Sequence, residues 1–515
     1  MARLYEYQGK ELLKKAGIHV ARGGPASSPE EARKVAESLG VPCVVKAQAW
    51  VTGRASLGGI KKVETPGEAE DAARAILGLV MKGFKVEQVL VEERLDIERE
   101  FYAGVIINDS EKCPVVIFSS KGGTGIEEIA REYPDKVARA TLDVRKGLSL
   151  EEARSLVGKT GIQDGLTDRL AGALVTLYRV ARQWEARACE INPLVLLKNG
   201  ELCAADCRVS IDDYAVFRHP ELGIEIAREF DRPATDLEKI AWKVEANDYR
   251  GTFYYIQMAQ GFKKEDNYLG FHGAGGGGSM MSMDAVLARG FKLATFCDTS
   301  GNPPASKVYR AAKIILASGP VVGYFASGSG VASQEQFHSA RGLLKAFREE
   351  NLSVPAVIRL GGNQEEKAMD ILHTYTKDLP APVEAYGKND SPGFCADRLV
   401  ALLKDFKPKE RKVAPRTPIP KESRYAFPIQ TGEIEIDHSL CPSCAKKPCV
   451  WECPKVVFKI EEGKPVLAMT PEEAKKGGCT ECLACEIACE FEGKKALHIS
   501  LPIAGLPEYR SKTNI

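Results

Sequence analysis

Three features are missing from this 515-residue sequence, and each absence excludes a class of protein. Neither sign of charge is in excess, because 71 Lys and Arg residues stand against 70 Asp and Glu, so nucleic-acid binding is not expected as the main role. No apolar run approaches the roughly 20 residues that span a bilayer, so no membrane span is expected. The stretch 1–17 has the pattern of an amphipathic helix and not of a signal peptide, which predicts a cytoplasmic protein.

The chain is long enough for three or four domains of roughly 100 to 200 residues each. In residues 1–230, short apolar runs with strand character such as Cys43–Lys46 alternate with helical stretches such as Ser28–Leu39. From 240 to 407 the alternation is more regular, and each strand is followed by a Gly-rich turn and a helix. This pattern predicts an α/β multidomain protein whose second domain has a parallel sheet with helices on both faces.

Five prolines fall among basic and polar residues in 408–428, which predicts an extended, fairly stiff linker. The compact segment after it, 429–515, contains eight of the fifteen cysteines. A secreted disulfide framework would spread its cysteines along a short chain, so this distribution argues against one. The scattered cysteines are expected to be small, buried and reduced core residues. They are Cys43, Cys113, Cys189, Cys203, Cys207, Cys297 and Cys395.

The clustered cysteines form two groups, CPSCAKKPCVWECP and CTECLACEIACE, and the second is a C-x2-C-x2-C-x3-C run. Three closely spaced thiolates fit three corners of an iron-sulfur cube, and the fourth cysteine of each run usually reaches the other cube. Two structural zinc sites are the alternative. The segment resembles a bacterial two-cluster ferredoxin domain of α+β type, with four residues between Cys444 and Cys449 where two are usual, and Glu490 where a proline is common. The first predicted 4Fe-4S set is Cys441, Cys444, Cys449 and Cys489, and the second is Cys453, Cys479, Cys482 and Cys485.

Two further patterns suit nucleotide chemistry. A strand carries Lys46, and a Gly-bearing loop, 52–59, carries Arg54, a combination typical of a phosphate clamp. Glu190 and Asn192 lie at the start of a strand. Asp206 follows Asn192 by fourteen residues, which places it on the neighbouring strand of a hairpin that turns at Asn199–Gly200. Oxygen ligands placed in this way suit magnesium shared with phosphates.

Taken together, LYEYQGKELL, VVKAQ with GR, and EINP followed by the aspartate resemble the β subunit of succinyl-CoA synthetase, an ATP-grasp protein. The resemblance covers residues 1 to about 406 and implies an ATP-grasp domain in 1–230 and a flavodoxin-like CoA-ligase domain in 240–407. FHGAGGGGSMMSMD resembles the segment that begins the helix facing a phosphohistidine, which a partner α subunit carries in that family. The family's Phe-Gly-Gly-Ile loop is replaced by YFASGSGVASQ, so an acid other than succinate, bulkier or aromatic, fits equally well.

The resemblance assigns roles to individual residues. Lys46, Gly53, Arg54 and Ala55 would contact ATP phosphates, and Glu92, Leu95 and Glu100 would line the base and ribose. Asn192 and Asp206 would hold Mg²⁺. The acid substrate would contact His272, Ser329, Gly330 and Val331. The candidate catalytic residues are Arg54, Glu190, Arg208 and His272.

The leading hypothesis is a β-like subunit of an ADP-forming acid–CoA ligase, with ATP/ADP, Mg²⁺, two 4Fe-4S clusters, and CoA bound mainly by an α-like partner that carries the phosphohistidine. The ferredoxin domain would couple the ligase to a low-potential oxidoreductase. One alternative is an ATP-driven or ATP-gated electron-transfer subunit. Another is an electron-transfer module on a non-catalytic ATP-grasp scaffold, and ATP-dependent carboxylation is a further one.

Overall fold

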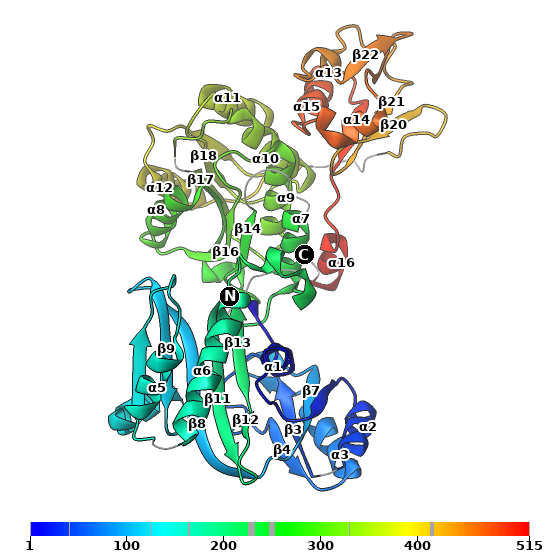
Figure 1. The fold of residues 1–515 in the computed structure, drawn as a ribbon. Helices are drawn as coiled ribbons and strands as arrows, with labels where there is room; N and C mark the ends of the chain where they lie inside the picture. Colours follow the sequence, from blue (N-terminus) through cyan, green and yellow to red (C-terminus); the bar gives the residue numbers. More distant parts are fainter. Residues whose placement is uncertain are drawn as a thin grey trace. The chain divides into compact units, whose positions relative to one another are not determined.

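The computed structural model describes residues 2–40, 42–123, 125–162, 165–224, 232–246, 253–328, 330–411 and 417–513. The chain forms two compact units, 1–234 and 235–515, each with its own sheets and hydrophobic cores (Figure 1). The second unit contains both the segment expected to be ligase-like and the cysteine-rich segment.

The larger sheet of unit 1 has seven strands in the order β1-β13-β11-β8-β9-β10, with β12 paired to β11, and all its pairings are antiparallel. Helix α6 packs on β11 and β8, and α5 packs on α6, so one face of the sheet is covered by a continuous apolar core. The strands are β1 (Ala2–Arg3), β8 (Ile97–Asn108), β9 (Cys113–Ser119), β10 (Val137–Thr141), β11 (Ala186–Leu197), β12 (Leu202–Ala204) and β13 (Cys207–Ile211). The helices are α1 (Glu6–Lys15), α4 (Ile126–Glu132), α5 (Leu150–Gly158) and α6 (Gly165–Gln183), with 3-10 turns η1 (Pro134–Lys136), η2 (Val216–Arg218) and η3 (Pro220–Leu222).

The smaller sheet of unit 1 has the order β2-β7-β3-β4 and is covered by α2 and α3. Both helices begin in the same way. Ser28 and Thr65 are N-caps that accept hydrogen bonds from backbone N–H groups, and a proline occupies the first helical turn. The elements are β2 (Gly23–Ala26), β3 (Cys43–Gln48), β4 (Ile60–Val63), β7 (Gln88–Glu93), α2 (Pro29–Leu39) and α3 (Pro66–Ile76), with a two-stranded ribbon of β5 (Val80–Met81) and β6 (Phe84–Lys85).

The main sheet of unit 2 has the order β14-β16-β15-β17-β18-β19, parallel except for the edge strand β14. Helices α8 and α12 cover one face, while α9 and α10 pack in the core of the other, as the sequence predicts. The strands are β14 (Tyr254–Gln257), β15 (Tyr268–Ala274), β16 (Lys292–Asp298), β17 (Gly323–Gly328), β18 (Ala356–Arg359) and β19 (Val383–Tyr386). The helices are α7 (Asp236–Ala246), α8 (Gly276–Leu287), α9 (Ala305–Leu316), α10 (Phe337–Glu349), α11 (Glu365–Tyr375) and α12 (Pro392–Leu403), with the 3-10 turn η4 (Lys264–Asp266).

The cysteine-rich segment has α+β structure, with a three-stranded sheet β20-β21-β24 and a hairpin β22-β23. Its core is continuous with that of α9 and α10, and the Tyr375 and Phe491 rings stack at 4.1 Å between centroids. The last five residues of the expected linker form an edge strand, because Tyr425 and Phe427 pack into this core. The elements are β20 (Arg424–Pro428), β21 (Glu433–Asp437), β22 (Phe458–Glu461), β23 (Lys464–Leu467), β24 (Leu497–Ser500), α13 (Pro448–Trp451), α14 (Pro471–Glu473), α15 (Ala484–Phe491) and α16 (Leu506–Thr513), with a π-type turn η5 (Ala474–Gly478).

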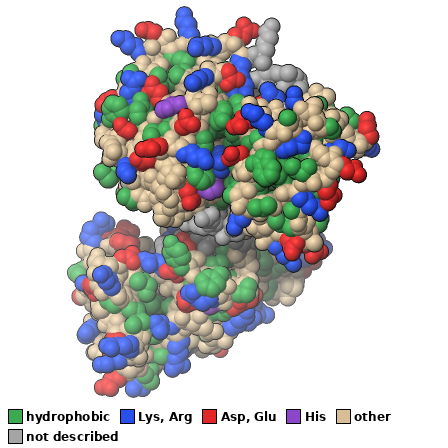
Figure 2. Space-filling model, turned by 90° about the horizontal axis from the view of Figure 1, so that it is seen from above, with side chains coloured by type: hydrophobic (Ala, Val, Ile, Leu, Met, Phe, Trp, Pro, Cys, Tyr) green, Lys and Arg blue, Asp and Glu red, His purple; other side chains and the backbone are tan. Residues whose placement is uncertain are grey.

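The surface agrees with the balanced composition. On the face shown in Figure 2, Lys and Arg side chains are interspersed with Asp and Glu, and apolar side chains lie in small groups between them. Within the described ranges, no helix is both long and apolar enough to cross a bilayer.

Candidate functional site

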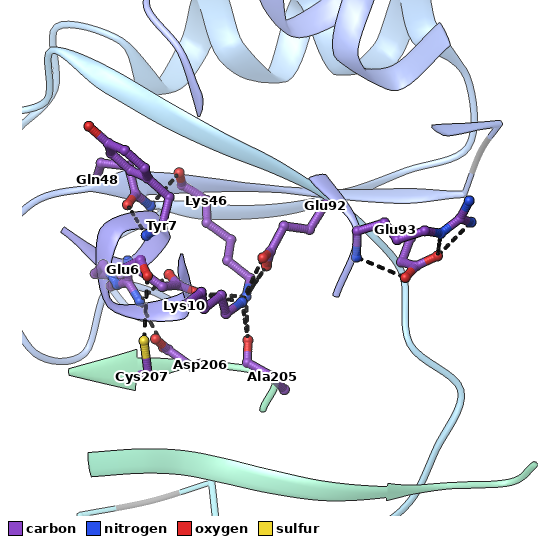
Figure 3. A network of polar contacts seen from close by, with 12 residues as sticks. Glu6, Tyr7, Lys10, Lys46, Gln48, Glu92, Glu93, Ala205, Asp206 and Cys207 are labelled. Carbon is purple, nitrogen blue, oxygen red and sulfur yellow. Dashed lines mark hydrogen bonds and ion pairs between the residues drawn. The ribbon is translucent and has the colours of Figure 1, made fainter. Parts of the chain in front are cut away.

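A buried network of six charged side chains joins the two sheets of unit 1. Helix α1 contributes two of them, β3 and β7 contribute one each, and the other two lie in the loop after β3 and just before β13. Figure 3 shows the side chains from α1, β3 and β7 pointing toward one another. The members are Glu6, Lys10, Lys46, Arg54, Glu92 and Asp206.

Lys46 is at the centre of this network. Its Nζ lies 2.9 Å from Glu6 Oε1 and 2.8 Å from Glu92 Oε2, and it donates to the Ala205 carbonyl at 2.8 Å. Lys10 repeats the pattern, because its Nζ lies 2.9 Å from Glu6 and 2.6 Å from Glu92 and also donates to Ala205. The two ammonium groups therefore share the same three acceptors.

Arg54 links the glycine-bearing loop to the larger sheet. One guanidinium nitrogen lies 2.7 Å from Glu6 Oε2 and 2.7 Å from Asp206 Oδ2, and the other donates to the Ala47 carbonyl at 2.9 Å. The loop is thereby held against both β3 and the strand that follows Asp206. Four residues of the predicted nucleotide site, Lys46, Arg54, Glu92 and Asp206, are thus brought together.

The carboxyl groups of the network differ in acidity. Burial works to raise the pKa of Glu6, but the charges of Lys10, Lys46 and Arg54 outweigh it and hold that pKa well below its usual range. Burial and the charge of Glu6 instead raise the pKa of Asp206, against the opposing effect of Arg54. Three cations face three carboxylates, so the net charge of the network is zero when all six groups are charged. An entering phosphate must therefore replace a carboxylate as the partner of a cation, or bind together with a cation of its own.

Sequence reasoning missed Glu6 and Lys10. They lie one turn apart on α1, are 5% and 3% exposed, and belong to the helix face that also buries Leu13. The available signal was the Glu and Lys at i, i+4 within EYQGK, on a face whose other members are apolar. Buried charges on such a face require partners from elsewhere in the fold.

The two predicted magnesium ligands lie on adjacent backbone. The N–H of Asn192 donates to the Asp206 carbonyl at 3.1 Å, and its side-chain Oδ1 accepts from the N–H of Gly123 at 3.0 Å. The hairpin from β11 to β12 turns at Asn199–Gly200, which confirms the predicted turn. Within the described residues, no group of three or more His, Cys, Asp or Glu side chains is placed so that it could hold a metal ion.

The other residues assigned to the nucleotide lie outside the ion network. Gly53, with a φ of +73°, and Ala55 are exposed in the loop that carries Arg54. Leu95 packs against the apolar group of Val195, Leu197 and Cys203. Glu100 lies in β8 beside Gly123, which connects it to the Asn192 end of the site.

Glu190 and Arg208 face each other as register partners on β11 and β13. Burial raises the pKa of Glu190, and Glu127 raises it further, while Arg208 works in the opposite direction. A carboxyl group with a raised pKa is suited to proton transfer, so Glu190 keeps its predicted catalytic role as a prediction.

In unit 2, His272 lies inside strand β15 and is 4% exposed. Its Nδ1 lies 2.6 Å from the Tyr324 hydroxyl and its Nε2 lies 3.0 Å from Thr299 Oγ1, so both ring nitrogens have protein partners. Burial lowers the pKa of His272 to about 4, which keeps the ring neutral near pH 7. This arrangement does not favour the predicted contact with an acid substrate.

The remaining substrate residues follow the carboxyl end of β17. The register places His272 opposite Ala326 inside the sheet, whereas Gly330 and Val331 come after the strand ends. Val331 is 81% exposed, and Gly330 has a φ of +80° beside the Arg359 side chain. Ser329 lies outside the described residues. The glycines before Met280 open α8 as predicted, and three of them form its first turn.

The eight clustered thiols influence one another electrostatically, but no three of them are placed in the described residues so that they could hold a metal ion, and the two predicted cluster sets stay predictions. Burial raises the pKa of Cys449 to about 12, and the nearby thiol of Cys489 adds to the increase. Cys485 is affected in the same way by burial and by Cys482. Electrostatic interactions join the thiols in two sets. One is Cys441, Cys444, Cys449 and Cys489, and the other is Cys453, Cys479, Cys482 and Cys485.

The scattered cysteines behave largely as expected. No disulfide involves any of them, and six of the seven are buried. Cys113, at the start of β9, is only partly buried, so the expectation fails there because the residue lies at a strand end.

The fold and the site of unit 1 define an ATP-grasp protein. A lysine on a strand of the smaller sheet and an arginine on a glycine-bearing loop lie opposite an aspartate side chain next to a strand of the larger sheet. Residues 3–196 match the ATP-grasp domain family. The chain is 38% identical over 369 residues to the succinate–CoA ligase [GDP-forming] subunit beta of Thermus thermophilus, covering 72% of this chain and 93% of that one. It is also 38% identical over 379 residues to the [ADP-forming] subunit beta 2 of Archaeoglobus fulgidus, covering 73% and 94%.

The chain therefore belongs to the succinate–CoA ligase β-subunit family, and it is a subunit of a nucleoside-diphosphate-forming acid–CoA ligase. These two alignments leave more than a quarter of the chain unmatched. Among solved structures, ATP citrate lyase from Methanothrix soehngenii has a TM-score of 0.64 at 17% identity, covering 78% of this chain and 99% of that one. At this identity the likeness shows the shared fold alone.

Proposed function

We propose that this chain is the β-like subunit of an enzyme that interconverts an acid, CoA and ATP with acyl-CoA, ADP and phosphate, and that its cysteine-rich segment couples this ligase to a low-potential oxidoreductase. An α-like partner subunit supplies the phosphohistidine and most of the CoA site. The observation that carries the ligase part is the convergence of Lys46 and Arg54 on Glu6, with Arg54 also bound to Asp206.

In the nucleotide site, Lys46 and Arg54 supply the positive charge that phosphate oxygens require. The Arg54 guanidinium binds the Asp206 carboxylate in this structure. A phosphate that binds Arg54 in its place frees the carboxylate to bind a cation. The backbones of Asn192 and Asp206 are hydrogen-bonded to each other, and both residues carry side-chain oxygen atoms of the kind that Mg²⁺ prefers. When bound, the ion supplies charge neutralisation for the transferring phosphoryl group.

The acid substrate belongs at the loop after β17. Ligands of open parallel sheets bind beyond the carboxyl ends of the strands, where Gly330 and Val331 lie. His272 is enclosed by Tyr324 and Thr299, so its contribution is to hold β15 in place beneath that loop. The altered loop sequence supports an acid other than succinate.

The cysteine-rich segment is proposed to hold two 4Fe-4S clusters, one on each four-thiol set. Burial alone opposes the thiolate form in both sets, and a bound cluster supplies the positive charge that compensates for it. The N–H groups of Val457 and Leu497 donate to the sulfur atoms of Cys453 and Cys489, as is common around such clusters. When bound, the clusters supply one-electron transfer.

Calorimetric titration of Mg-ATP into anaerobically purified protein tests the ligase part. Wild type should bind with micromolar affinity, and Lys46→Ala should weaken binding by about 10- to 100-fold because a charge-assisted contact is lost. Lys61→Ala, an exposed lysine on β4, should bind as wild type does. Near-UV circular dichroism checks that Lys46→Ala is folded. Equal affinity in wild type and folded Lys46→Ala would refute this nucleotide site.

The alternatives give different outcomes. CoA-dependent formation of ADP and phosphate, in the presence of the α-like partner, supports the ligase. ATP turnover that requires a reductant would support an ATP-gated electron-transfer subunit instead, and no nucleotide affinity would support a non-catalytic scaffold.

Metal analysis tests the cluster assignment. Wild type should contain iron and absorb near 400 nm, and Cys482→Ala should lose roughly half of that iron because one of two clusters loses a ligand. Cys297→Ala, a buried cysteine outside both sets, is the control and should keep it. Stoichiometric zinc without iron would support the zinc alternative.

A further inference from the structure

Arg359, the last residue of β18, is a buried arginine that is only 7% exposed. Its guanidinium donates three hydrogen bonds, and all of them go to backbone carbonyls. The acceptors are Gly328 at 2.6 Å, Asp390 at 2.5 Å and Lys388 at 3.1 Å. Within the residues that the structure describes, no carboxylate lies within ion-pair distance of this guanidinium. A buried charge is costly without a partner of opposite sign, so the site favours an anion.

The guanidinium lies at a junction of the loops that follow β17, β18 and β19. Gly361, after β18, has no side chain where these loops meet. A Cβ there would lie 2.5 Å from the Gly330 Cα and 2.8 Å from the Lys388 Cα. A Cβ on Gly330 would lie 3.0 Å from Arg359 Nη2, so the guanidinium lies directly against the loop after β17. Three neighbouring parallel strands end here, which is where open parallel sheets bind their ligands.

The acids around this junction have other partners. Asp390 offers Arg359 only its carbonyl, and its carboxylate accepts from the N–H of Gly387 at 3.0 Å. Arg398 on α12 shows the contrast, because its guanidinium donates to the Glu384 carboxylate at 3.0 and 2.7 Å. The charge of Arg398 is therefore compensated within the protein, whereas that of Arg359 is offset only by carbonyl dipoles.

We propose that Arg359 binds the carboxylate group of the acid substrate at this junction. The inference rests on the proposed function, because a ligase of this kind holds an acid beside the loop that contains Gly330 and Val331. A guanidinium has five N–H groups, so two remain beyond the three that bind carbonyls. They match the two oxygen atoms of one carboxylate, and the three carbonyl bonds hold the guanidinium in place before the acid arrives.

The test uses full-length protein with formate as the probe, because a site for the carboxylate of any acid admits the smallest carboxylate. Sodium formate should raise the melting temperature of wild type more than sodium chloride does at the same concentration, since a ligand of the folded state stabilises it. Arg359→Gln removes the charge and should weaken formate binding by about tenfold or more. Arg398→Gln is the control, and its response to formate should equal that of wild type because Arg398 already has a carboxylate partner.

Arg359→Lys separates carboxylate binding from a purely structural role. It keeps the charge but cannot repeat the three carbonyl bonds, so it should bind formate more weakly than wild type and more tightly than Arg359→Gln. Circular dichroism checks that both variants are folded. An equal formate response in wild type and Arg359→Gln, or equal losses in the two variants, would overturn the proposal.

Inorganic phosphate, titrated in parallel, distinguishes a phosphoryl group from a carboxylate. A response that depends on Arg359 for phosphate but not for formate would overturn the assignment to the acid. Lys46→Ala should keep the full formate response, because Lys46 belongs to the ion network of unit 1. Failure of the proposed nucleotide site is therefore distinguishable from failure of this one.

Discussion

Lys345 on α10 lies 2.8 Å from the Glu486 carboxylate on α15, the helix that contains Cys485 and Cys489. The side chains are 6% and 13% exposed, so this ion pair lies inside the seam between the ligase-like sheet and the cysteine-rich segment. Glu486 also contacts His498 at 2.8 Å and accepts from the N–H of Ile499. The electron-transfer and ligase parts proposed for this chain are thus joined by a buried charged contact as well as by apolar packing.

Replacement of Lys345 by methionine should destabilise unit 2. The variant keeps the side-chain length but leaves Glu486 buried without its main cation, which typically costs about 3 kcal/mol or more. Chemical denaturation of wild type and Lys345→Met measures the difference. Lys404→Met, an exposed lysine at the end of α12, is the control and should change stability by less than about 0.5 kcal/mol. A stability loss no larger than the control's would show that the pair does not hold the seam.

Glu6 should stabilise the ion network most when no nucleotide is bound, because it faces three cations. Glu6→Gln removes the charge that faces Lys10, Lys46 and Arg54, so the network gains an uncompensated positive charge. We expect the free energy of unfolding to fall by about 3 kcal/mol. Bound Mg-ATP supplies phosphate oxygens and should raise the melting temperature of the variant more than that of wild type. The control is Glu11→Gln, an exposed residue on the same helix, and a ligand-induced shift equal in Glu6→Gln and wild type would contradict this account.

Asp206→Asn should separate magnesium binding from phosphate binding. The amide keeps the shape and can still accept from Arg54, but it removes the charge that a divalent cation requires. We expect Mg-ATP affinity to fall by about tenfold or more, while affinity for ATP measured without Mg²⁺ stays equal or rises. Calorimetry in the presence and absence of Mg²⁺ gives both values. Equal losses under the two conditions would mean that Asp206 acts only as a partner of Arg54.

His272 should make stability dependent on pH. Its pKa is about 4 in the folded chain and about 6.5 when unfolded, so the unfolded state takes up the proton first as pH falls. The stability that the neutral ring contributes is complete above about pH 6.5 and is lost as pH falls toward 4. Between pH 7 and pH 5, wild type should lose about 2 kcal/mol more than His272→Gln, as measured by denaturation at both pH values. The same loss in both proteins would show that the ring is accessible to protons in the folded state.

Local patterns were sufficient to locate most elements. The strand predicted at Cys43–Lys46 and the helix predicted at Ser28–Leu39 occur within a few residues of those positions. Alternation of apolar residues and the capping Ser28 are signals carried by neighbours in the chain, so they can be found without the fold. The same holds for Lys46, Arg54 and Asp206, which their motifs identified.

By itself, the sequence determined the α/β order of the elements and the hairpin that brings Asn192 beside Asp206, because neighbours along the chain fix these. Only the tertiary structure decided that Glu6 and Lys10 complete the ion network of unit 1 and that His272 is enclosed within a strand. It also decided that the cysteine-rich segment packs on α10 instead of following a free linker. The physical reason is that the stability of a buried charge depends on partners distant in sequence. Lys10 bonds to Ala205 across 195 positions, and Lys345 bonds to Glu486 across 141.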